Sequence, residues 1–143
     1  MKASKVSRWE HFSHDADIGI RGYGDSMESA FAQAALAMTA VICDIDTVKP
    51  LSARDIKCEA PDHELLFVEW LNALIYEMAV EHMLFNRFEV RIDGTVLHAT
   101  AWGESIDRSR HQPAVEVKGA TYTALEVRHK AEGDWLAQCV IDV

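Results

Sequence analysis

Apolar side chains recur at helical spacing in two segments of the chain. The first segment, about residues 26–41, begins next to Asp25 and Glu28, whose three-residue separation is that of a capping box. Its apolar positions fall on one side of a helix: Met27, Ala30, Phe31, Ala34, Ala35, Met38 and Val41. The other side is polar and includes Thr39. We therefore expect this helix to have one face on the core and one face in solvent.

The second segment, about residues 62–81, follows Pro61 and is apolar on most sides. Its polar residues share one narrow stripe: Asp62, Glu69, Asn72 and Glu77. A helix of this composition is largely buried, and we expect it to lie between layers of the fold.

Alternation of apolar and polar residues, which is typical of strands, covers much of the remaining chain. It predicts strands at residues 9–14, 18–23, 51–58, 84–92, 96–102, 114–120, 122–129 and 135–143. Residues 103–113 are expected to form a polar loop, and short turns are expected at Asp15–Asp17, Asp93-Gly94 and Glu132–Asp134. Connections this short join antiparallel strands. We therefore predict a single α+β domain over residues 1–143, with largely antiparallel sheets and two main helices.

The composition is that of a globular chain with its own core. Of the 143 residues, 49% are hydrophobic and 26% are charged, a balance that excludes intrinsic disorder. Lys and Arg total 14 and Asp and Glu total 23, which gives a net charge of −9. Strong direct binding to nucleic acid is therefore not expected. Cys43, Cys58 and Cys139 show neither metal-site nor redox spacing, so we expect buried small side chains.

No segment of the sequence predicts attachment to a membrane. Residues 1–8 carry three basic side chains, but the apolar segment of a signal peptide does not follow them. The apolar run at residues 65–80 is interrupted by polar residues and is shorter than the roughly 20 residues that span a bilayer. We therefore expect a cytoplasmic protein.

Acidic groups near the two ends of the chain are candidates for a metal site. The sequence His14-Asp15-Ala16-Asp17 places two carboxylates and an imidazole at a hairpin corner, although Asp is also a common turn residue. At the other end, Asp142 precedes the terminal Val143, whose α-carboxylate adds a further charge. The last strand keeps alternate apolar residues up to Val143, so we expect the tail to be docked rather than frayed.

If the last strand pairs near the opening hairpin, Asp17, Asp142 and Val143 come together. Like charges about 4 Å apart repel by roughly 4 kcal/mol at an effective dielectric constant near 20. A cation between them would remove this repulsion. A cluster of carboxylates without thiolates suits calcium, magnesium or manganese rather than zinc.

A third group of polar residues lies in and after the predicted loop: Glu104, Asp107, His111, Glu116 and Lys118. In isolation they are expected to be solvated charges, and the functional alternative is a lip around the acidic cluster. Lys118 either extends to solvent or supplies a counter-charge to carboxylates and phosphates. Nucleophile elbows, phosphate-binding glycine loops and dinucleotide fingerprints are absent from the sequence.

These motifs, together with parts of both predicted helices, resemble the archease family over almost the whole chain. The matching segments are His14–Gly19, Ser26–Phe31, Glu69–Tyr76, Gly103-Glu104, Glu116–Tyr122 and Val140–Val143. The resemblance implies an accessory protein rather than an enzyme. Its partner would be an RNA-splicing ligase of tRNA splicing or RNA repair, whose guanylylation and multiple turnover it promotes.

The resemblance also implies the residues of the site. A divalent cation, with calcium as the first candidate and magnesium or manganese as alternatives, would be bound by Asp17, Asp142 and Val143. Lys118, with Asp17 and Asp142, would activate the partner. The candidates for the surrounding groups are His14, Asp15, Glu104, His111 and Glu116. Two positions depart from the family pattern: Asp15 stands where Thr is usual, and Thr123 stands where a His often follows a Thr-Tyr pair.

Two other classes of function are compatible with the sequence. A general chaperone or protein-binding module, acting on RNA-processing or modification enzymes, would use the second helix if its apolar side were partly exposed. A metal-dependent hydrolase would use a carboxylate-bound metal to activate water, but the sequence offers no evident general base beside the carboxylates.

Overall fold

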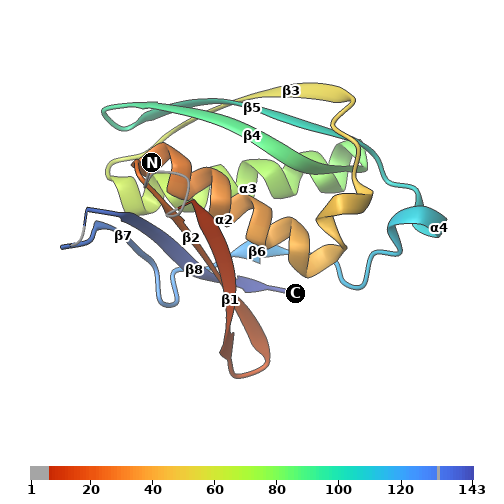
Figure 1. The fold of residues 1–143 in the computed structure, drawn as a ribbon, viewed down its shortest axis with the longest axis horizontal. Coiled ribbons are helices and arrows are strands. Elements are labelled where there is room, and N and C mark those ends of the chain that lie inside the picture. Colours follow the sequence, from red (N-terminus) through yellow and green to blue (C-terminus); the bar gives the residue numbers. More distant parts are fainter. Residues whose placement is uncertain (1–6, 132) are drawn as a thin grey trace.

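Two antiparallel sheets enclose a layer of two long helices (Figure 1). The computed structural model describes residues 7–131 and 133–143. The expectations for residues 1–6 and for Glu132 in the last turn therefore lie outside the described residues. The predicted α+β class, with antiparallel sheets and two main helices, is confirmed.

The larger sheet has the strand order β1-β2-β8-β6, and β7 pairs with another part of β8. Its strands are β1 (Arg8–His14), β2 (Asp17–Gly24), β6 (Gly119–Ala120), β7 (Glu126–His129) and β8 (Trp135–Asp142). The smaller sheet has the order β3-β5-β4, with β3 (Ser52–Glu59), β4 (Met83–Asp93) and β5 (Val96–Ser105). The long helices are α2 (Met27–Ile42) and α3 (His63–Glu81), and the connections hold η1 (Ile45–Thr47) and α4 (Arg108–His111).

Helix α2 is buried against both sheets because small residues let it approach closely. A Cβ atom at Gly22 of β2 would overlap the carbonyl oxygen of Ala30. Toward the other sheet, the Thr39 hydroxyl donates to the carbonyl oxygen of Phe85 in β4 at 2.8 Å. The expectation that Thr39 faces solvent is therefore wrong, since its side chain meets a main-chain acceptor in a second layer.

The start of α2 lies one residue later than the predicted capping box. Ser26 is the N-cap, and its hydroxyl oxygen accepts from the backbone N–H of Ser29 at 3.0 Å. Asp25 instead accepts a hydrogen bond from the Ser29 hydroxyl at 3.1 Å. Two neighbouring cap-forming residues compete here, and the serine satisfies the helix N–H group.

Helix α3 lies between the two sheets, as its nearly uniform hydrophobicity predicts. Phe67, Trp70 and Leu71 are fully buried, and the Trp70 indole N–H donates to the carbonyl oxygen of Phe31 in α2 at 3.0 Å. Tyr76 and Val80 are the exposed large apolar residues of this helix, 61% and 49% accessible. Among the described helices, none combines the length and hydropathy needed to cross a bilayer.

The segment between β5 and β8 departs most from the prediction. The strand expected at 114–120 is reduced to Gly119–Ala120, and the strand expected at 122–129 is reduced to Glu126–His129. The expected loop at 103–113 contains the end of β5 and the short helix α4. Residues 112–118 cross the ends of the two long helices, where the N–H of Ala114 donates to the carbonyl oxygen of Ile42 at 2.8 Å. The backbone of Ala114 therefore bonds to a helix end and not to a neighbouring strand.

Candidate metal and partner site

The candidate site begins at the hairpin between β1 and β2. His14 and Asp17 are the last paired residues, and Asp15 and Ala16 form the two-residue turn. Asp15 has a φ of 51°, a left-handed conformation that Asp tolerates better than a β-branched residue does. The Asp15 side chain is 92% exposed and lies 3.8 Å from Nδ1 of His14. The corner is thus tight, and the Asp15 carboxylate is open to solvent.

The last strand reaches this corner. Strands β2 and β8 are antiparallel, with Ile18 opposite Ile141, and the next position of the same register sets Asp17 opposite Asp142. Directly opposed residues of neighbouring strands have Cβ atoms about 5 Å apart and share one face of the sheet. The expectation that the last strand pairs near the opening hairpin is therefore confirmed.

The two aspartates lie on the outer face of the larger sheet. Ile20 and Cys139 are fully buried and lie on the face that packs on α2. Since successive side chains of a strand point to opposite faces, Asp17 and Asp142 project away from the helices. Asp142 is exposed, and Asp17 is partly exposed.

The terminal residue is docked, as its apolar neighbours predicted. Val143 is partly buried and packs against the hydrophobic core. On the far side of β8, the backbone N–H of Lys118 donates to the carbonyl oxygen of Asp142 at 2.7 Å. The Lys118 side chain is exposed. The end of the sheet therefore gathers Asp17, Asp142, Val143 and Lys118 from three separate parts of the chain.

The oxygen atoms at this end suit a hard cation. In the described part of the chain, no hydrogen bond or ion pair occupies the side-chain carboxylates of Asp17 and Asp142. Together with the terminal carboxylate they form an all-oxygen donor set, which calcium and magnesium prefer. The described residues contain no group of three or more His, Cys, Asp and Glu side chains placed to hold a metal. The predicted set has only two such side chains and depends on the chain terminus, so metal binding stays a prediction.

Two of the predicted surrounding residues have other partners. Glu104 ends β5 in the smaller sheet and is 8% exposed, and His111 of α4 is 3% exposed. Glu104 accepts hydrogen bonds from both terminal nitrogens of Arg110 at 2.9 Å and from the backbone N–H of Lys49 at 2.8 Å. The expectation that Glu104 and His111 are solvated loop charges is wrong.

The histidine of this network is held from both sides. The backbone N–H of Asp107 donates to Nδ1 of His111 at 2.9 Å, so Nε2 carries the proton that His111 donates to Glu104 at 2.9 Å. The hydrogen bonds from Arg110, Lys49 and His111 outweigh the opposing effect of burial and lower the pKa of Glu104 to about 2. This network holds the 104–111 connection together without a metal.

The remaining predicted residues and the cysteines take simple positions. Glu116 is exposed and lines a pocket to which Arg108 also contributes, and no spacing in the sequence indicates that these two residues share a pocket. Thr123 lies in a turn beside β8, where its carbonyl oxygen accepts from the N–H of Val140 at 3.0 Å. Cys43, Cys58 and Cys139 are free thiols, and burial raises the pKa of Cys139 to about 12, as expected of a small buried side chain.

Comparison with known proteins gives a consistent result. A family model described as the Archease protein family matches residues 9–143. The protein archease of Pyrococcus abyssi is 40% identical over 142 residues, which cover 96% of this chain and 100% of that protein.

Two solved structures resemble the chain. The solution structure of protein 1598 of Methanobacterium thermoautotrophicum has a TM-score of 0.82 and 32% identity, and the match covers 100% of both chains. The crystal structure of an archease from Thermotoga maritima, described as a possible chaperone, has a TM-score of 0.62 and 17% identity, and the match covers 94% of this chain and 96% of that chain. At that identity the second likeness concerns the fold alone.

Proposed function

Because this chain belongs to the archease family, we propose that it is a metal-binding protein cofactor of an RNA-splicing ligase. In this proposal it promotes guanylylation of the ligase and permits repeated rounds of RNA joining. It performs no chemistry of its own. The resemblance of its motifs to the family supplies the identity of the partner, and the acidic end of the larger sheet supplies the means of action.

The observation that carries the proposal is the register of β2 and β8. It brings an aspartate from each end of the chain to opposed positions, next to the terminal carboxylate. An arrangement of like charges on adjacent strands is unfavourable unless something positive offsets it. Stability of the sheet does not require two opposed aspartates, because a neutral residue in place of either one would leave the backbone hydrogen bonds between β2 and β8 intact.

The donor set defines what the acidic end can do. Asp17, Asp142 and the carboxylate of Val143 would hold a hard cation, which, when bound, supplies positive charge for phosphate oxygens. Lys118, whose backbone is bonded to that of Asp142, adds an exposed ammonium group at the same end of the sheet, suited to a phosphate or to a carboxylate of the ligase. The exposed carboxylates of the corner let this end enter a cleft in another protein.

The charge of the chain favours a protein partner over direct contact with RNA. Binding to a phosphate backbone is driven by cationic side chains that displace its counterions. A protein with a net charge of −9 is instead repelled by the phosphates. A ligase cleft that handles GTP and RNA ends is lined with cationic groups and metals, and it suits an acidic protein. The ligase would thus carry the RNA, and this protein would act on the ligase.

Multiple-turnover ligation tests the proposal. We expect Asp17→Asn and Asp142→Asn each to lose most of the stimulation of an RNA-splicing ligase in the presence of GTP, a divalent metal and RNA ends. Asp55→Asn is a matched control, since Asp55 is an exposed strand aspartate of the smaller sheet. Stimulation at the wild-type level by both site variants would contradict the proposal.

A chaperone function has one observation in its favour, the exposed Tyr76 and Val80 on α3. Most of the other large apolar side chains of that helix are buried, so this surface is small for a receptor of unfolded chains. A chaperone would suppress aggregation of unrelated proteins and would tolerate Asp142→Asn. The ligase cofactor proposed here would do neither.

A further inference from the structure

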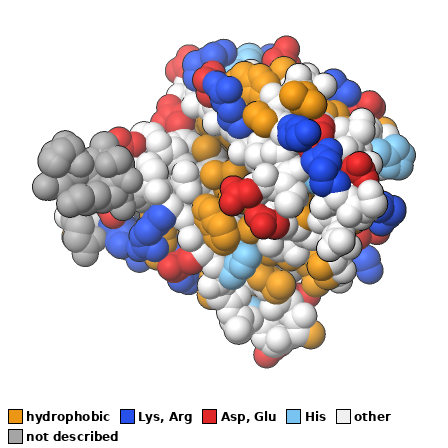
Figure 2. Space-filling model, turned by 45° about the vertical axis from the view of Figure 1, so that its right-hand side comes forward, with side chains coloured by type: hydrophobic (Ala, Val, Ile, Leu, Met, Phe, Trp, Pro, Cys, Tyr) orange, Lys and Arg blue, Asp and Glu red, His pale blue; other side chains and the backbone are white. Residues whose placement is uncertain are grey.

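A pocket of about 450 Å³, lined mostly by apolar residues but also by charged ones, lies at the ends of the two long helices. Five buried or half-buried side chains make its floor and walls: Ile42, Ile75, Met78, Leu84 and Ile106. The residues of the pocket come from α2, α3, β4, α4 and the connections next to α3 and α4. The face turned forward in Figure 2 carries hydrophobic side chains near its middle, with acidic side chains among them.

Main-chain hydrogen bonds fix the walls of the pocket. The N–H of Ile106 donates to the carbonyl oxygen of His82 at 2.9 Å, and the N–H of Ala114 donates to that of Ile42 at 2.8 Å. Each bond ties a connection to the C-terminal end of a helix, which also satisfies carbonyl groups that the helix leaves free. The pocket therefore does not depend on a ligand for its shape.

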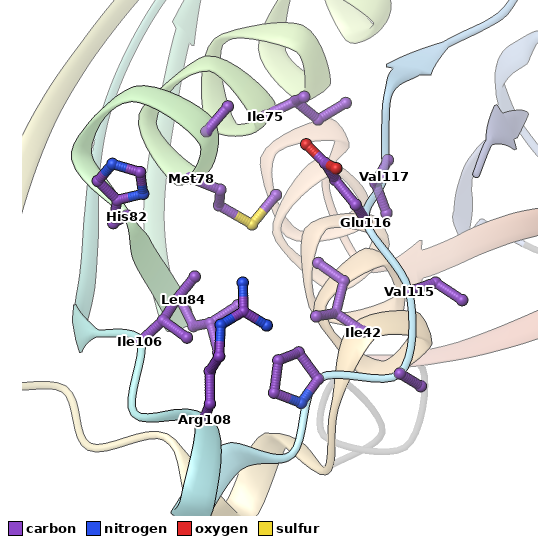
Figure 3. A pocket seen from close by; sticks show the side chains of 13 residues that line it. Ile42, Ile75, Met78, His82, Leu84, Ile106, Arg108, Val115, Glu116 and Val117 are labelled. Atoms are coloured by element: carbon purple, nitrogen blue, oxygen red, sulfur yellow. The ribbon is translucent and has the colours of Figure 1, made fainter.

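Two opposite charges face this apolar space. In Figure 3 the guanidinium of Arg108 is directed into the pocket from below, and the carboxylate of Glu116, from the segment at the right, is directed toward Ile75. They do not form an ion pair with each other, and within residues 7–131 and 133–143 neither side chain has another hydrogen-bond or ion-pair partner. The nearby Arg110, in contrast, is fully engaged by Glu104.

We propose that this pocket binds a segment of the partner protein that carries a large apolar side chain next to an acidic residue. The apolar side chain would fill the space over Met78 and Leu84, where its burial provides most of the affinity. Arg108 would pair with the acidic side chain through its planar guanidinium. Glu116 would accept an N–H group of the segment's main chain.

The position of the pocket favours a protein segment as its occupant. Glu116 is followed after one residue by Lys118, whose backbone binds that of Asp142. A protein that covers the acidic end of the larger sheet would therefore lie close to Glu116, which lines the pocket. This inference rests on the proposed function, because it assigns a second contact to the same partner.

Two short peptides test the pocket in the isolated protein. The probe is acetyl-Gly-Phe-Asp-Gly-amide, and its charge-reversed control has Lys in place of Asp. Titration followed by NMR should give saturable shifts at Met78, Val115 and Val117, with about fivefold weaker binding of the Lys peptide. Arg108→Glu should reverse this preference, because it exchanges attraction for repulsion at an exposed position.

A pair of bulky substitutions on α3 supplies the matched control. Ala79 lines the pocket and is exposed, and Val80 follows it but does not line the pocket. Ala79→Trp should block peptide binding, whereas Val80→Trp should not. Absence of saturable shifts, or equal binding of both peptides to the wild type and to Arg108→Glu, would overturn the proposal. Dimerisation that Ala79→Trp abolishes would also overturn it, since the occupant would then be a second copy of this chain.

Ligation assays separate this inference from the proposed function. Arg108→Glu should raise the concentration needed for half-maximal stimulation by about fivefold while keeping the maximum, whereas Asp142→Asn should lower the maximum. An unchanged half-maximal concentration for Arg108→Glu, with loss of stimulation in Asp142→Asn, would refute the docking pocket alone. If the wild type does not stimulate the ligase, the proposed function fails. The peptide titration then tests independently whether the pocket binds an apolar side chain next to an acidic one.

Discussion

The environment of Glu104 differs strongly from the solvated environment that the sequence predicts for it. It stands at the end of β5 before a polar stretch, yet its carboxylate is almost fully buried and receives four hydrogen bonds from Arg110, Lys49 and His111. A buried carboxylate that is satisfied in this way stabilises the fold only while it is ionised. The donors lie up to 55 positions away in the chain, so spacing could not indicate them.

Glu104→Gln should lower the free energy of unfolding at neutral pH by about 2 kcal/mol, because it removes the charge that Arg110 and His111 bind. Chemical denaturation measures this loss. Asp55→Asn, at an exposed carboxylate, is the control and should change stability little.

The same residue should give the wild type a distinct dependence on acid. The pKa of Glu104 is about 2 in the folded protein, against 4.5 for an ordinary Glu. Between these values the unfolded chain binds the extra proton, so stability falls as pH is lowered through this range. Denaturation at several pH values should show a shallower loss in Glu104→Gln. An equal loss in both proteins would contradict the assigned network.

At the scale of elements, the period of hydrophobic residues predicted both helices and most strands. It failed at residues 114–118, whose alternation resembles a strand but whose backbone bonds go to the end of α2 and to β8. Residues 114–117 all line a pocket, and of these only Val117 is buried. A paired strand and a segment that crosses helix ends can have the same pattern of apolar and polar residues. Only the hydrogen-bond partners of the backbone distinguish the two.

The contact between α2 and β2 brings backbone against backbone at Gly22 and should be sensitive to a single methyl group. Gly22→Ala places a Cβ atom on the backbone of Ala30 and Ala34, so we expect a loss of about 2–3 kcal/mol in the free energy of unfolding. Gly119→Ala is the control, because the nearest atom to its Cβ lies 3.9 Å away. Similar stability of the two variants would show that α2 can retreat from β2 without cost.

At the scale of the whole molecule, the candidate site depends on contacts between the two ends of the chain. The sequence indicated the acidic corner and the docked tail, because Asp residues mark turns and alternate apolar residues predict a buried strand. It could not indicate that Arg108 and Glu116 line one pocket, since that arrangement arises only when α4 and the segment after it pass the ends of the long helices. The proximity of side chains on two paired strands is thus easier to predict from the sequence than the proximity of side chains brought together by packing of separate elements.

The central claim is that the carboxylates of Asp17, Asp142 and Val143 hold one hard cation at the end of the larger sheet. Calorimetric titration with calcium ions of the metal-free protein tests it most directly. We predict one saturable site in the wild type and in Asp55→Asn, and its loss in Asp17→Asn and in Asp142→Asn. Equal calcium binding by all four proteins, or no binding by the wild type with calcium, magnesium or manganese, would contradict the claim.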